Sequence, residues 1–531
     1  MTAGVGSYDV AVVGSGIGGL AAAALLARFG GRRVCLLEQH STIGGLTQTF
    51  RRPGGWEWDA GVHYVGEMAE GRWPRRLMDA ITGHSVDWLR LPEPADLFLY
   101  PDLEFASDGG ETGLTTRLKA LFPEEEAAID AYFSDVRTVA RSVGSALLEP
   151  RLPTPVRGLL RGLGILSDWT RTESTGDYLA RRFRNPRLRG LLASIWGDYG
   201  VPPARSAFPL HAAVVAHYLD GAWYPRGGGS ALAKGALTVI GNAGGRILRR
   251  HRVTQIRLEK GRVAGIDAIT RIAGQDRRVA ISAPLVISDA GAENTYRHLL
   301  APEAGARMAD RLAPFIEPGS GLSVYLGLNG SPRDLGFTGG NVWFFDGFDH
   351  DAILRQPDRT CPPAPTVVFL SFPALRSGEG KQNTAEIVSF LSADVFAPWH
   401  DRPWRRRGAD YEALKDRLAD ALIARIEARY PGFAGMISYR EVSTPLSVEH
   451  FIASPRGAIY GLTGTVERYR ALGLLGVRTA IPGLLLTGAD AFVPGVAGAA
   501  FAGAAAAGAA MGPFGFVRLM GRIARERNYP S

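Results

Sequence analysis

The sequence of 531 residues predicts an α/β fold, and three observations support that class. Residues 8–38 place a glycine-rich turn and a helix between two apolar runs that have the length of buried strands. Residues 483–512 contain another apolar run, which leads into a helix of small residues. Between them, strand-like runs alternate with helices such as 410–430, where Leu414, Leu418, Leu422 and Ile426 recur every four residues. The runs at 322–328, 342–345, 367–372 and 386–391 are predicted to form a second, mixed sheet.

The first unit has the spacing of a dinucleotide-binding fingerprint. The strand at 10–13 runs directly into Gly14-Ser15-Gly16-Ile17-Gly18-Gly19, and the next strand ends in Glu38, 24 residues after Gly14. Gly14 suits the tight turn, Gly16 lets the backbone approach a pyrophosphate, and Gly19 lets helix and strand pack closely. The helix N-terminus offers N–H groups to phosphates, and Glu38 is placed to bind ribose hydroxyls. The alternative is a glycine-rich turn in an unrelated α/β protein.

Two further motifs favour FAD over NAD as the dinucleotide. Gly44-Gly45 follows Glu38 by six residues and lets another backbone segment close over the pyrophosphate. A late strand carries Gly488 and Asp490 at its carboxyl end, where a carboxylate can hold ribityl hydroxyls. The small residues that follow let an isoalloxazine lie against backbone N–H groups. The residues that these motifs predict to bind the cofactor are Gly14, Ser15, Gly16, Gly18, Gly19, Glu38, Gln39, Gly44, Gly45, Thr47, Gly488, Asp490, Gly495, Val496 and Gly498.

Composition describes an ordinary globular protein with a basic surface. Hydrophobic residues make up 46% and charged residues 21%, and the formal net charge is +8. No nucleic-acid motif accompanies the charge, so an anionic membrane surface is the favoured basic-surface partner. The two cysteines, Cys35 and Cys361, exclude a disulfide framework. Residues 1–7 lack the features of a signal peptide, which predicts an intracellular, cytoplasmic protein.

Three segments raise the question of membrane contact. The run from Gly495 to Gly512 has 18 residues, almost all Ala, Gly or Val, but close packing explains it better than a membrane span. Residues 151–169 and 514–527 interleave apolar side chains with arginines. Each could lie on the inner face of a membrane. The first could equally be a lid over the active site, and the second a helix packed on the body.

The chain resembles the FAD-dependent polyene oxidoreductases, which include phytoene desaturase, carotenoid isomerase and retinol saturase. The resemblance covers 12–66, 224–300 and 445–510, and Gly61-Val62-His63-Tyr64-Val65-Gly66 is similar to the saturases and isomerases in particular. It implies a Rossmann-type, glutathione reductase-like FAD domain interleaved with a mixed-sheet substrate domain and a helical lid. It also implies that the Val253 backbone lies beside the adenine. The expected segments are 1–75, 224–295 and 481–512 for FAD, 76–223 and 296–480 for lid and substrate, and 513–531 for a basic tail.

The resemblance implies chemistry on a carbon–carbon double bond of a long apolar isoprenoid or polyene. His63 and Tyr64 are the candidate catalytic residues, and they favour saturation or cis–trans isomerisation over desaturation. His63 could give or take a proton while the flavin moves a hydride; the alternative is a structural histidine bonded to backbone. Asp59 is expected to brace the segment.

Other readings of the same sequence remain open. A carotenoid-type desaturase shares the scaffold, an amine-oxidase-like flavoenzyme would need an aromatic cage beside the flavin, and a prenyl-binding escort protein would not use flavin. The ten histidines show no ligand spacing, so no metal site is predicted. Gly227-Gly228-Gly229 lacks a preceding strand and a distal acid, so an external electron donor or acceptor is expected.

Overall fold

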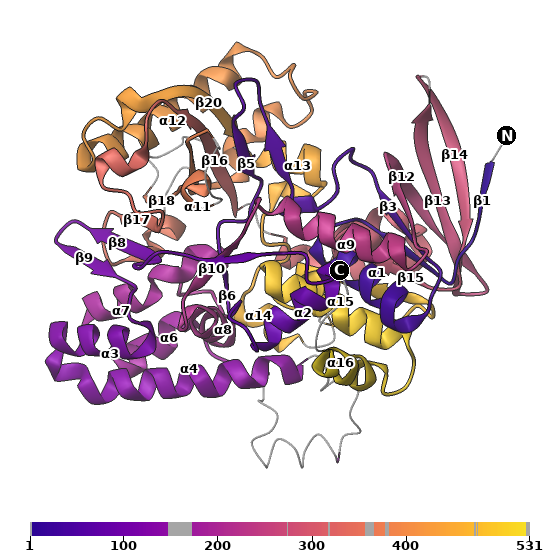
Figure 1. The fold of residues 1–531 in the computed structure, drawn as a ribbon, viewed down its shortest axis with the longest axis horizontal. Coiled ribbons are helices and arrows are strands. Elements are labelled where there is room, and N and C mark those ends of the chain that lie inside the picture. The colour runs from indigo at the N-terminus through magenta and orange to yellow at the C-terminus, as the bar shows by residue number, and fades with distance from the viewer. Residues whose placement is uncertain are drawn as a thin grey trace.

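The computed structural model describes residues 3–146, 155, 172–272, 274–316, 319–355, 366–376, 382–471, 474 and 476–526. The predicted basic segment 151–169, apart from residue 155, and Cys361 lie outside these ranges. Figure 1 shows two sheet regions side by side, with helices beneath the seven-stranded sheet and around the five-stranded one.

A five-stranded parallel sheet is assembled from three distant parts of the chain. Its order is β11-β3-β2-β15-β21. The strands are β2 (Val10–Val13), β3 (Val34–Glu38), β11 (Arg246–Arg249), β15 (Val286–Ser288) and β21 (Leu484–Leu486). Every residue of β2, β3, β15 and β21 is buried, as expected for a parallel sheet covered on both faces. Cys35 lies in β3 as a buried core residue.

Helices of small residues cover this sheet closely. Helix α1 (Ile17–Gly30) packs against α15 (Val496–Ala510) and α9 (Ser230–Asn242). A Cβ on Gly503 would lie 2.5 Å from the carbonyl oxygen of Gly18, so α15 can approach α1 this closely only with glycine there. The small-residue run is therefore a packed core helix in this structure, as predicted.

A four-stranded sheet adjoins the parallel one. Its order is β1-β14-β13-β12, with β1 parallel to β14 and the other pairs antiparallel. The strands are β1 (Ala3–Ser7), β12 (His251–Glu259), β13 (Arg262–Ile272) and β14 (Gln275–Ser282). In Figure 1 this sheet stands at the right of the molecule. It carries Val253 on β12.

A seven-stranded mixed sheet forms the second region. Its order is β20-β16-β19-β18-β17-β8-β9, and only β17 and β8 are parallel neighbours. The strands are β8 (Asp96–Tyr100), β9 (Leu103–Ala106), β16 (Gly319–Leu328), β17 (Asn341–Phe345), β18 (Val367–Ser371), β19 (Thr384–Ser392) and β20 (Ile437–Ser443). The predicted helix is α12 (Ala409–Arg429), which buries Leu414, Leu418, Leu422 and Ile426 in a core shared with this sheet.

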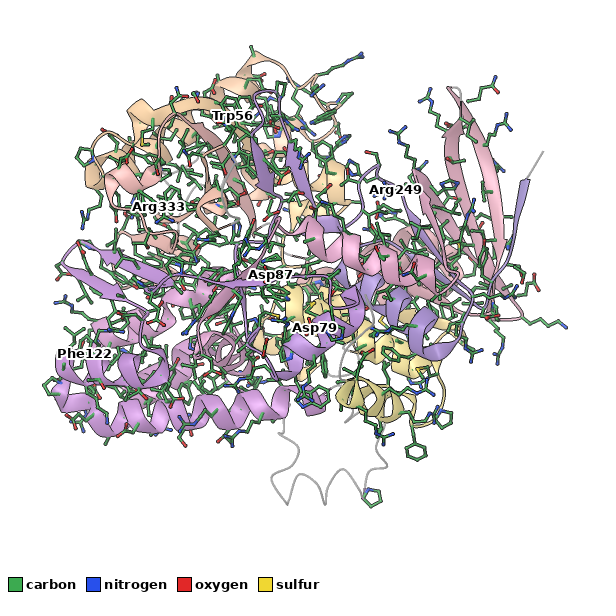
Figure 2. The ribbon with its side chains drawn as sticks, in the orientation of Figure 1. Trp56, Asp79, Asp87, Phe122, Arg249 and Arg333 are labelled. Atoms are coloured by element: carbon green, nitrogen blue, oxygen red, sulfur yellow. The ribbon has the colours of Figure 1, made fainter. Side chains whose placement is uncertain are left out.

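Smaller elements link the two regions. The sheets are β6-β10-β7, formed by Val65–Gly66, Ala222–Pro225 and Trp88–Arg90, and the hairpin of β4 (Thr49–Arg51) and β5 (Glu57–Asp59). The hairpin crosses to the seven-stranded sheet, where Trp58 Nε1 donates to the Leu326 carbonyl at 3.1 Å. Trp56 packs on Tyr439 of β20 with ring centroids 5.0 Å apart, and Figure 2 labels it there.

A group of helices lies below the seven-stranded sheet in Figure 1. They are α3 (Gly110–Leu121), α4 (Glu126–Ala146), α6 (Thr175–Arg182), α7 (Pro186–Ala193) and α8 (Phe208–Tyr218). Among the helices that the structure describes, none is long and apolar enough to cross a membrane by itself; α15 and α16 (Gly515–Arg525) reach that length and composition only as a pair bent by 120°.

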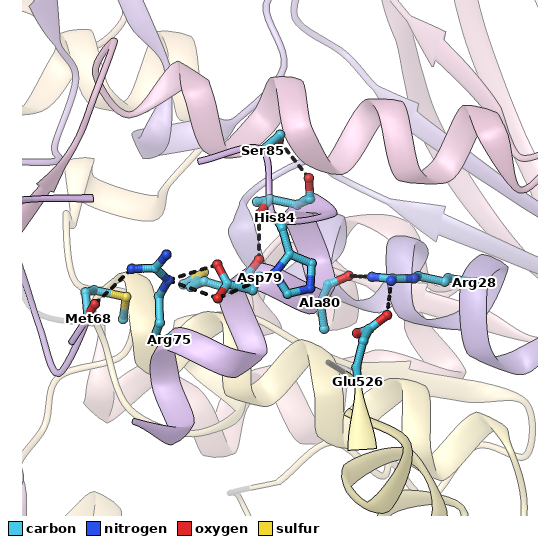
Figure 3. A network of polar contacts seen from close by, with 10 residues as sticks. Arg28, Met68, Arg75, Asp79, Ala80, His84, Ser85 and Glu526 are labelled. Atoms are coloured by element: carbon cyan, nitrogen blue, oxygen red, sulfur yellow. Dashed lines mark hydrogen bonds and ion pairs between the residues drawn. The ribbon is translucent and has the colours of Figure 1, made fainter. Parts of the chain in front are cut away.

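Helix α16 is anchored to the body at its carboxyl end. Leu519 and Ile523 are buried, while Phe514 and Val517 are 81% and 64% exposed. Arg28 of α1 donates to the Ala80 carbonyl at 2.8 Å and pairs with Glu526, which joins α1, α2 (Trp73–Thr82) and the end of α16 (Figure 3). The tail is thus a packed helix that keeps one apolar and basic face exposed.

Candidate active site

Two helix N-termini open into one cavity of about 440 Å³, called here the glycine-lined cavity. Helix α1 follows Gly16 and α15 follows Gly495, and neither N-cap has a side chain that accepts from the first turn. Neither first turn holds an acidic residue. No side chain from either helix's own cap or first turn therefore competes with an anionic ligand, and the buried Asp289 carboxyl lies against the start of α1.

The turn between β2 and α1 requires glycine because of its backbone conformation and its close contacts. Gly14 has φ +93°, a conformation that side chains disfavour. A Cβ on Gly18 would lie 2.6 Å from the Gly488 amide nitrogen. The late strand end and the first turn are thus in backbone contact, so any Cβ at position 18 would push them apart.

Glu38 holds the turn together from the end of β3. One carboxylate oxygen accepts from Ser15 N at 3.1 Å and from Ser15 Oγ at 2.6 Å, and the other accepts from His40 N at 2.7 Å. Ser15 Oγ in turn accepts from Gly44 N at 3.2 Å. Both glycine loops and the acid therefore form one network that lines the cavity.

Asp490 joins three segments from the opposite wall. Its two oxygens accept from Ala292 N and Leu462 N, each at 2.7 Å. The fully buried Arg468 donates to the carbonyls of Ala489 at 3.2 Å and Asp490 at 3.1 Å, and also to that of Leu462. The carboxylate predicted to hold ribityl hydroxyls is therefore also a clamp on the protein backbone.

Of the residues predicted for the cofactor, all except Gly19 and Gly498 line this cavity. Both glycines allow close packing instead. A Cβ on Gly19 would meet the carbonyl of Gly14, and a Cβ on Gly498 would lie 2.5 Å from the Val493 carbonyl oxygen. Val253 lines the cavity from β12.

Asp289 is a member of this site that the sequence interpretation missed. It follows β15, it lines the cavity, and its Oδ2 has no hydrogen-bond partner among the described residues. Burial raises the pKa of its carboxyl to about 7, with further contributions from the charges of Glu38 and Asp490, while the amides of Gly19 and Gly16 lower it. Three carboxylates thus converge on the glycine turn.

A second cavity, of about 840 Å³, lies on the face of the seven-stranded sheet and is called here the aromatic cavity. Its floor includes a row of cross-strand neighbours on β20, β16, β19, β18 and β17: Ser443, Ser323, Val388, Phe369 and Trp343. Neighbouring strands lie about 4.8 Å apart, so the row spans roughly 19 Å. It changes from serine at the β20 end to aromatic side chains at the β17 end.

The two cavities share a wall. The residues that line both are His40, Thr42, Leu46, Gln48, Gly61, Phe451, Ile452, Ile459 and Tyr460. Tyr460 donates its hydroxyl to the Gly197 carbonyl at 2.8 Å, which ties this wall to the aromatic end of the larger cavity. The two cavities are therefore adjacent along this wall.

His63 lines the aromatic cavity beside its aromatic end. Its Nδ1 lies 3.0 Å from Oε2 of the fully buried Glu386, and its ring meets Phe369 edge-on with centroids 5.0 Å apart. Glu386 accepts from Asp59 N at 3.0 Å through its other oxygen. Asp59 is itself held by Tyr224 and Gly229, so two buried carboxylates lie behind the histidine, and Asp59 has the predicted bracing contacts.

Tyr64 differs from what its pairing with His63 suggested. Its side chain lines neither cavity; its hydroxyl donates to Asp198 Oδ2 at 2.7 Å, and its ring stacks on Tyr218. Adjacent residues in an extended segment point to opposite sides, which separates Tyr64 from His63. Asp198 does line the aromatic cavity, and burial, followed by the charge of Asp96, raises its pKa well above the usual range. Asp198 is the polar group that the Tyr64 hydroxyl positions.

Two more site residues carried no sequence signal. The buried Arg376 donates to the His63 carbonyl at 2.6 Å and to the carbonyl of Gly339 at 2.6 Å, which fixes the backbone of the His63 segment. Glu386 belongs to a strand more than 300 positions later in the chain than His63. Among the described residues, no group of three or more His, Cys, Asp or Glu is positioned to hold a metal ion.

Comparisons with known proteins agree with this arrangement. Residues 12–81 match the family model of an NAD(P)-binding Rossmann-like domain. The chain is 35% identical to the all-trans-retinol 13,14-reductase of Rattus norvegicus over 92% of its length and 83% of that protein. It is 25% identical to the chloroplastic prolycopene isomerase of Arabidopsis thaliana over 93% of its length and 81% of that protein.

Solved structures support the fold. A variant of putrescine oxidase has a TM-score of 0.62 at 15% identity, and the match covers 95% of this chain and 98% of the putrescine oxidase chain. Cyclohexylamine oxidase from Brevibacterium oxydans has a TM-score of 0.57 at 16% identity and covers 98% of this chain and 99% of its own. The predicted α/β class is confirmed, and so is the resemblance that Gly61–Gly66 indicated. The chain belongs to the retinol saturase and carotenoid isomerase family of oxidoreductases.

Proposed function

We propose that the chain binds FAD, with the flavin at the wall shared by the two cavities. The donor set of the glycine-lined cavity fits such a group: two uncapped helix N-termini can receive phosphate and flavin oxygens, and Glu38 lies at the end of β3 for a ribose. The unpartnered Asp289 Oδ2 supplies one more acceptor. In this proposal Gly14–Gly19 and Gly44–Gly45 hold the pyrophosphate, Val253 contacts the adenine, and Gly495 and Val496 contact the isoalloxazine.

We further propose that the substrate is a long apolar polyene or isoprenoid and that the reaction saturates or isomerises a carbon–carbon double bond. Bound FAD would supply or take up the hydride that such chemistry requires. The relatives named above, a retinol reductase and a prolycopene isomerase, both act on polyenes by their names. The observation that carries the proposal is the wall that the two cavities share. Because of this wall, the aromatic cavity, which is also called the trough below and whose floor row spans roughly 19 Å, lies against the proposed cofactor site.

His63 is the residue to which we assign proton transfer. It lines the aromatic cavity beside the shared wall, and the carboxylate of Glu386 lies 3.0 Å from its Nδ1, so a protonated imidazole there would be paired with that carboxylate. Tyr64 acts as a positioning residue through Asp198. Burial of Asp198 keeps its proton on the carboxyl to higher pH, so this group is a second proton source facing the same trough.

An external partner must exchange electrons with the flavin, because the fingerprint accounts for one dinucleotide.

We also propose that the protein associates peripherally with an anionic membrane surface on its cytoplasmic side. The exposed Phe514 and Val517 on α16, together with Arg518 and Arg525 of the same helix, support this assignment. Such contact would bring an apolar substrate out of the bilayer.

An anaerobic absorbance spectrum, followed by a panel of polyenes before and after dithionite, tests the function directly. Reduced flavin that a polyene reoxidises would establish saturation. Isomerised product with the flavin left reduced would establish an isomerase, and oxidised flavin bleached by substrate would establish a desaturase instead. If the protein shows no flavin absorbance even after reconstitution with FAD, the proposal is wrong.

A further inference from the structure

The two ends of the aromatic cavity differ in charge as well as in polarity. The β17 end holds Trp343, Phe369 and His63 beside the shared wall. The β20 end lies at the opposite end of the cross-strand row. It is bordered by the loop that precedes α12 and by α13 (Pro445–Ile452). Five cationic side chains line the cavity: Arg51, Arg52, Arg405, Arg407 and Lys415.

Three of these cations are neutralised by carboxylates. Arg52 forms a two-pronged pair with Glu441, with both N–O distances at 2.6 Å, and Lys415 lies 2.7 Å from Glu412. Arg51 pairs with Glu57. These three contribute little net charge to the cavity, and they use both of the acids that line this end.

Arg407 is different because its charge is buried without a counter-ion. The residue is only 7% exposed, and no described carboxylate lies within ion-pair distance of it. One guanidinium nitrogen donates to the Leu446 carbonyl at a long 3.3 Å, Nε has no partner, and the group lies over the Tyr411 ring. An unpaired buried cation is costly, so such a group indicates that a ligand supplies the anion.

The surroundings of Arg407 add positive charge. Arg405 lies over the Trp404 ring at 4.3 Å and has no ion pair among the described residues. Burial lowers the pKa of the nearby His450, and Arg407 and His40 lower it further. The nearby acids have other partners: Glu449 of α13 lies 3.3 Å from His400 Nε2, and Asp410 lies 3.5 Å from Arg402. Arg405 and Arg407 are thus the cavity-lining cations without a described carboxylate partner, which favours binding of an anion.

We propose that the substrate carries an anionic end group, a carboxylate or a phosphate ester, which Arg407 and Arg405 bind while the polyene lies along the trough toward His63. This inference rests on the proposed function and adds the substrate's end group to it. Guanidinium groups bind carboxylate and phosphate oxygens with two parallel hydrogen bonds, and the interaction strengthens where water is excluded. A fixed anion at the β20 end would also set which double bond reaches the flavin.

The test measures binding of four probes to the purified holoenzyme at pH 8: a C20 polyene carboxylate, its methyl ester, its alcohol and a C20 isoprenoid diphosphate. Quenching of the intrinsic tryptophan fluorescence reports occupancy, because Trp343 and Trp404 line the aromatic cavity. The carboxylate or the diphosphate is expected to bind at least about tenfold more tightly than the ester and the alcohol. The stronger of the two anions identifies the end-group class.

Variants locate the preference. Arg407→Gln is expected to remove the advantage of the anionic probe, and Arg407→Lys to keep part of it. Arg406→Gln is the matched control, because Arg406 sits in the same loop, is exposed and does not line the cavity. If Arg407→Gln does not fold, Arg405→Gln must weaken the anionic probe alone.

Two outcomes overturn the inference, and they are distinguishable from failure of the function. Equal affinity of wild-type protein for the carboxylate, the diphosphate and the ester, with the flavin still reoxidised by polyenes, refutes the end group but leaves the proposed function intact. An anion preference that survives unchanged in Arg407→Gln refutes the assignment to this residue. Binding of no polyene at all refutes both.

Discussion

The two cavities of this protein are built in opposite ways. The glycine-lined cavity takes most of its wall from residues 13–48 and from the strand end at 487–499, and in each segment a turn follows directly on a buried strand. The aromatic cavity takes its lining from five strands of the seven-stranded sheet, from β4, from α12 and the loop before it, and from α13. Short sequence motifs therefore predict much of the glycine-lined cavity. The aromatic cavity forms only after distant strands have paired in register.

That difference predicts how well each cavity tolerates amino-acid substitutions. Glycines at the cofactor turn contact backbone atoms, which cannot move aside, so substitution there acts on both the cofactor and the packing of α1. Side chains in the trough contact other side chains, which can repack with small losses. We therefore expect large effects at the first cavity and graded effects at the second.

Gly18→Ala is the sharpest test of the rigid cavity. Its Cβ would lie 2.6 Å from Gly488 N, so the first turn and the late strand end must separate. We expect flavin binding to weaken roughly 100-fold or more and activity to disappear with it. The absorbance ratio of flavin to protein after purification measures this. Gly241→Ala is the control, since its Cβ would meet nothing within 4 Å, and equal flavin content in the two variants would contradict the prediction.

Asp289→Asn tests the cluster of carboxylates at the same turn. The folded pKa of Asp289 is about 7, against an ordinary 3.8. The folded state therefore holds this proton more tightly than the unfolded state, and the resulting stabilisation is lost as pH rises from about 4 through about 7, up to about 4 kcal/mol. Free energies of unfolding at several pH values should show this decline in the wild type and a flatter profile in the variant. Parallel profiles would exclude Asp289 as its source.

His63→Gln tests the chemistry at the junction of the cavities. We expect turnover to fall about 100-fold with flavin content unchanged, because the variant loses the proton carrier and not the cofactor contacts. Single-turnover reoxidation of the reduced flavin by a polyene separates this step from binding. His84→Gln, a histidine outside both cavities, is the control. Wild-type turnover in His63→Gln would remove this residue from the reaction.

Phe514→Ser with Val517→Ser tests the surface that would deliver substrate to the aromatic cavity. Both side chains are exposed, so folding should be unaffected, while co-sedimentation with anionic liposomes should fall a few-fold, about 1 kcal/mol. Leu121→Ser is the control, because Leu121 is 45% exposed on α3. A similar loss in Leu121→Ser would show that the effect is not specific to α16.

The same contrast explains what the sequence could predict. The strands and turns around Gly14, Gly44 and Gly488 follow from local spacing, and their lining of one cavity follows from the fingerprint. Asp289 went unnoticed because Ser288-Asp289-Ala290 has no distinctive spacing, and Glu386 because its partner His63 lies in a distant segment. The pairing of Ser443, Ser323, Val388, Phe369 and Trp343 depends on strand register, which no short window encodes. Arg407 is one of sixty Lys and Arg residues, and its burial with one long hydrogen bond becomes visible only in the structure.

The scattered origin of the parallel sheet has a consequence for biosynthesis. Strands β2 and β3 leave the ribosome early, but β15 pairs with β2 only after residue 288 has been made, and β21 pairs with β15 only after residue 486. Until then the open side of β2, and later that of β15, is an unpaired apolar edge, which favours aggregation and engages chaperones. The cofactor site cannot form before translation is nearly complete, so a truncation that removes β21 and α15 should give an insoluble product and not a weaker enzyme.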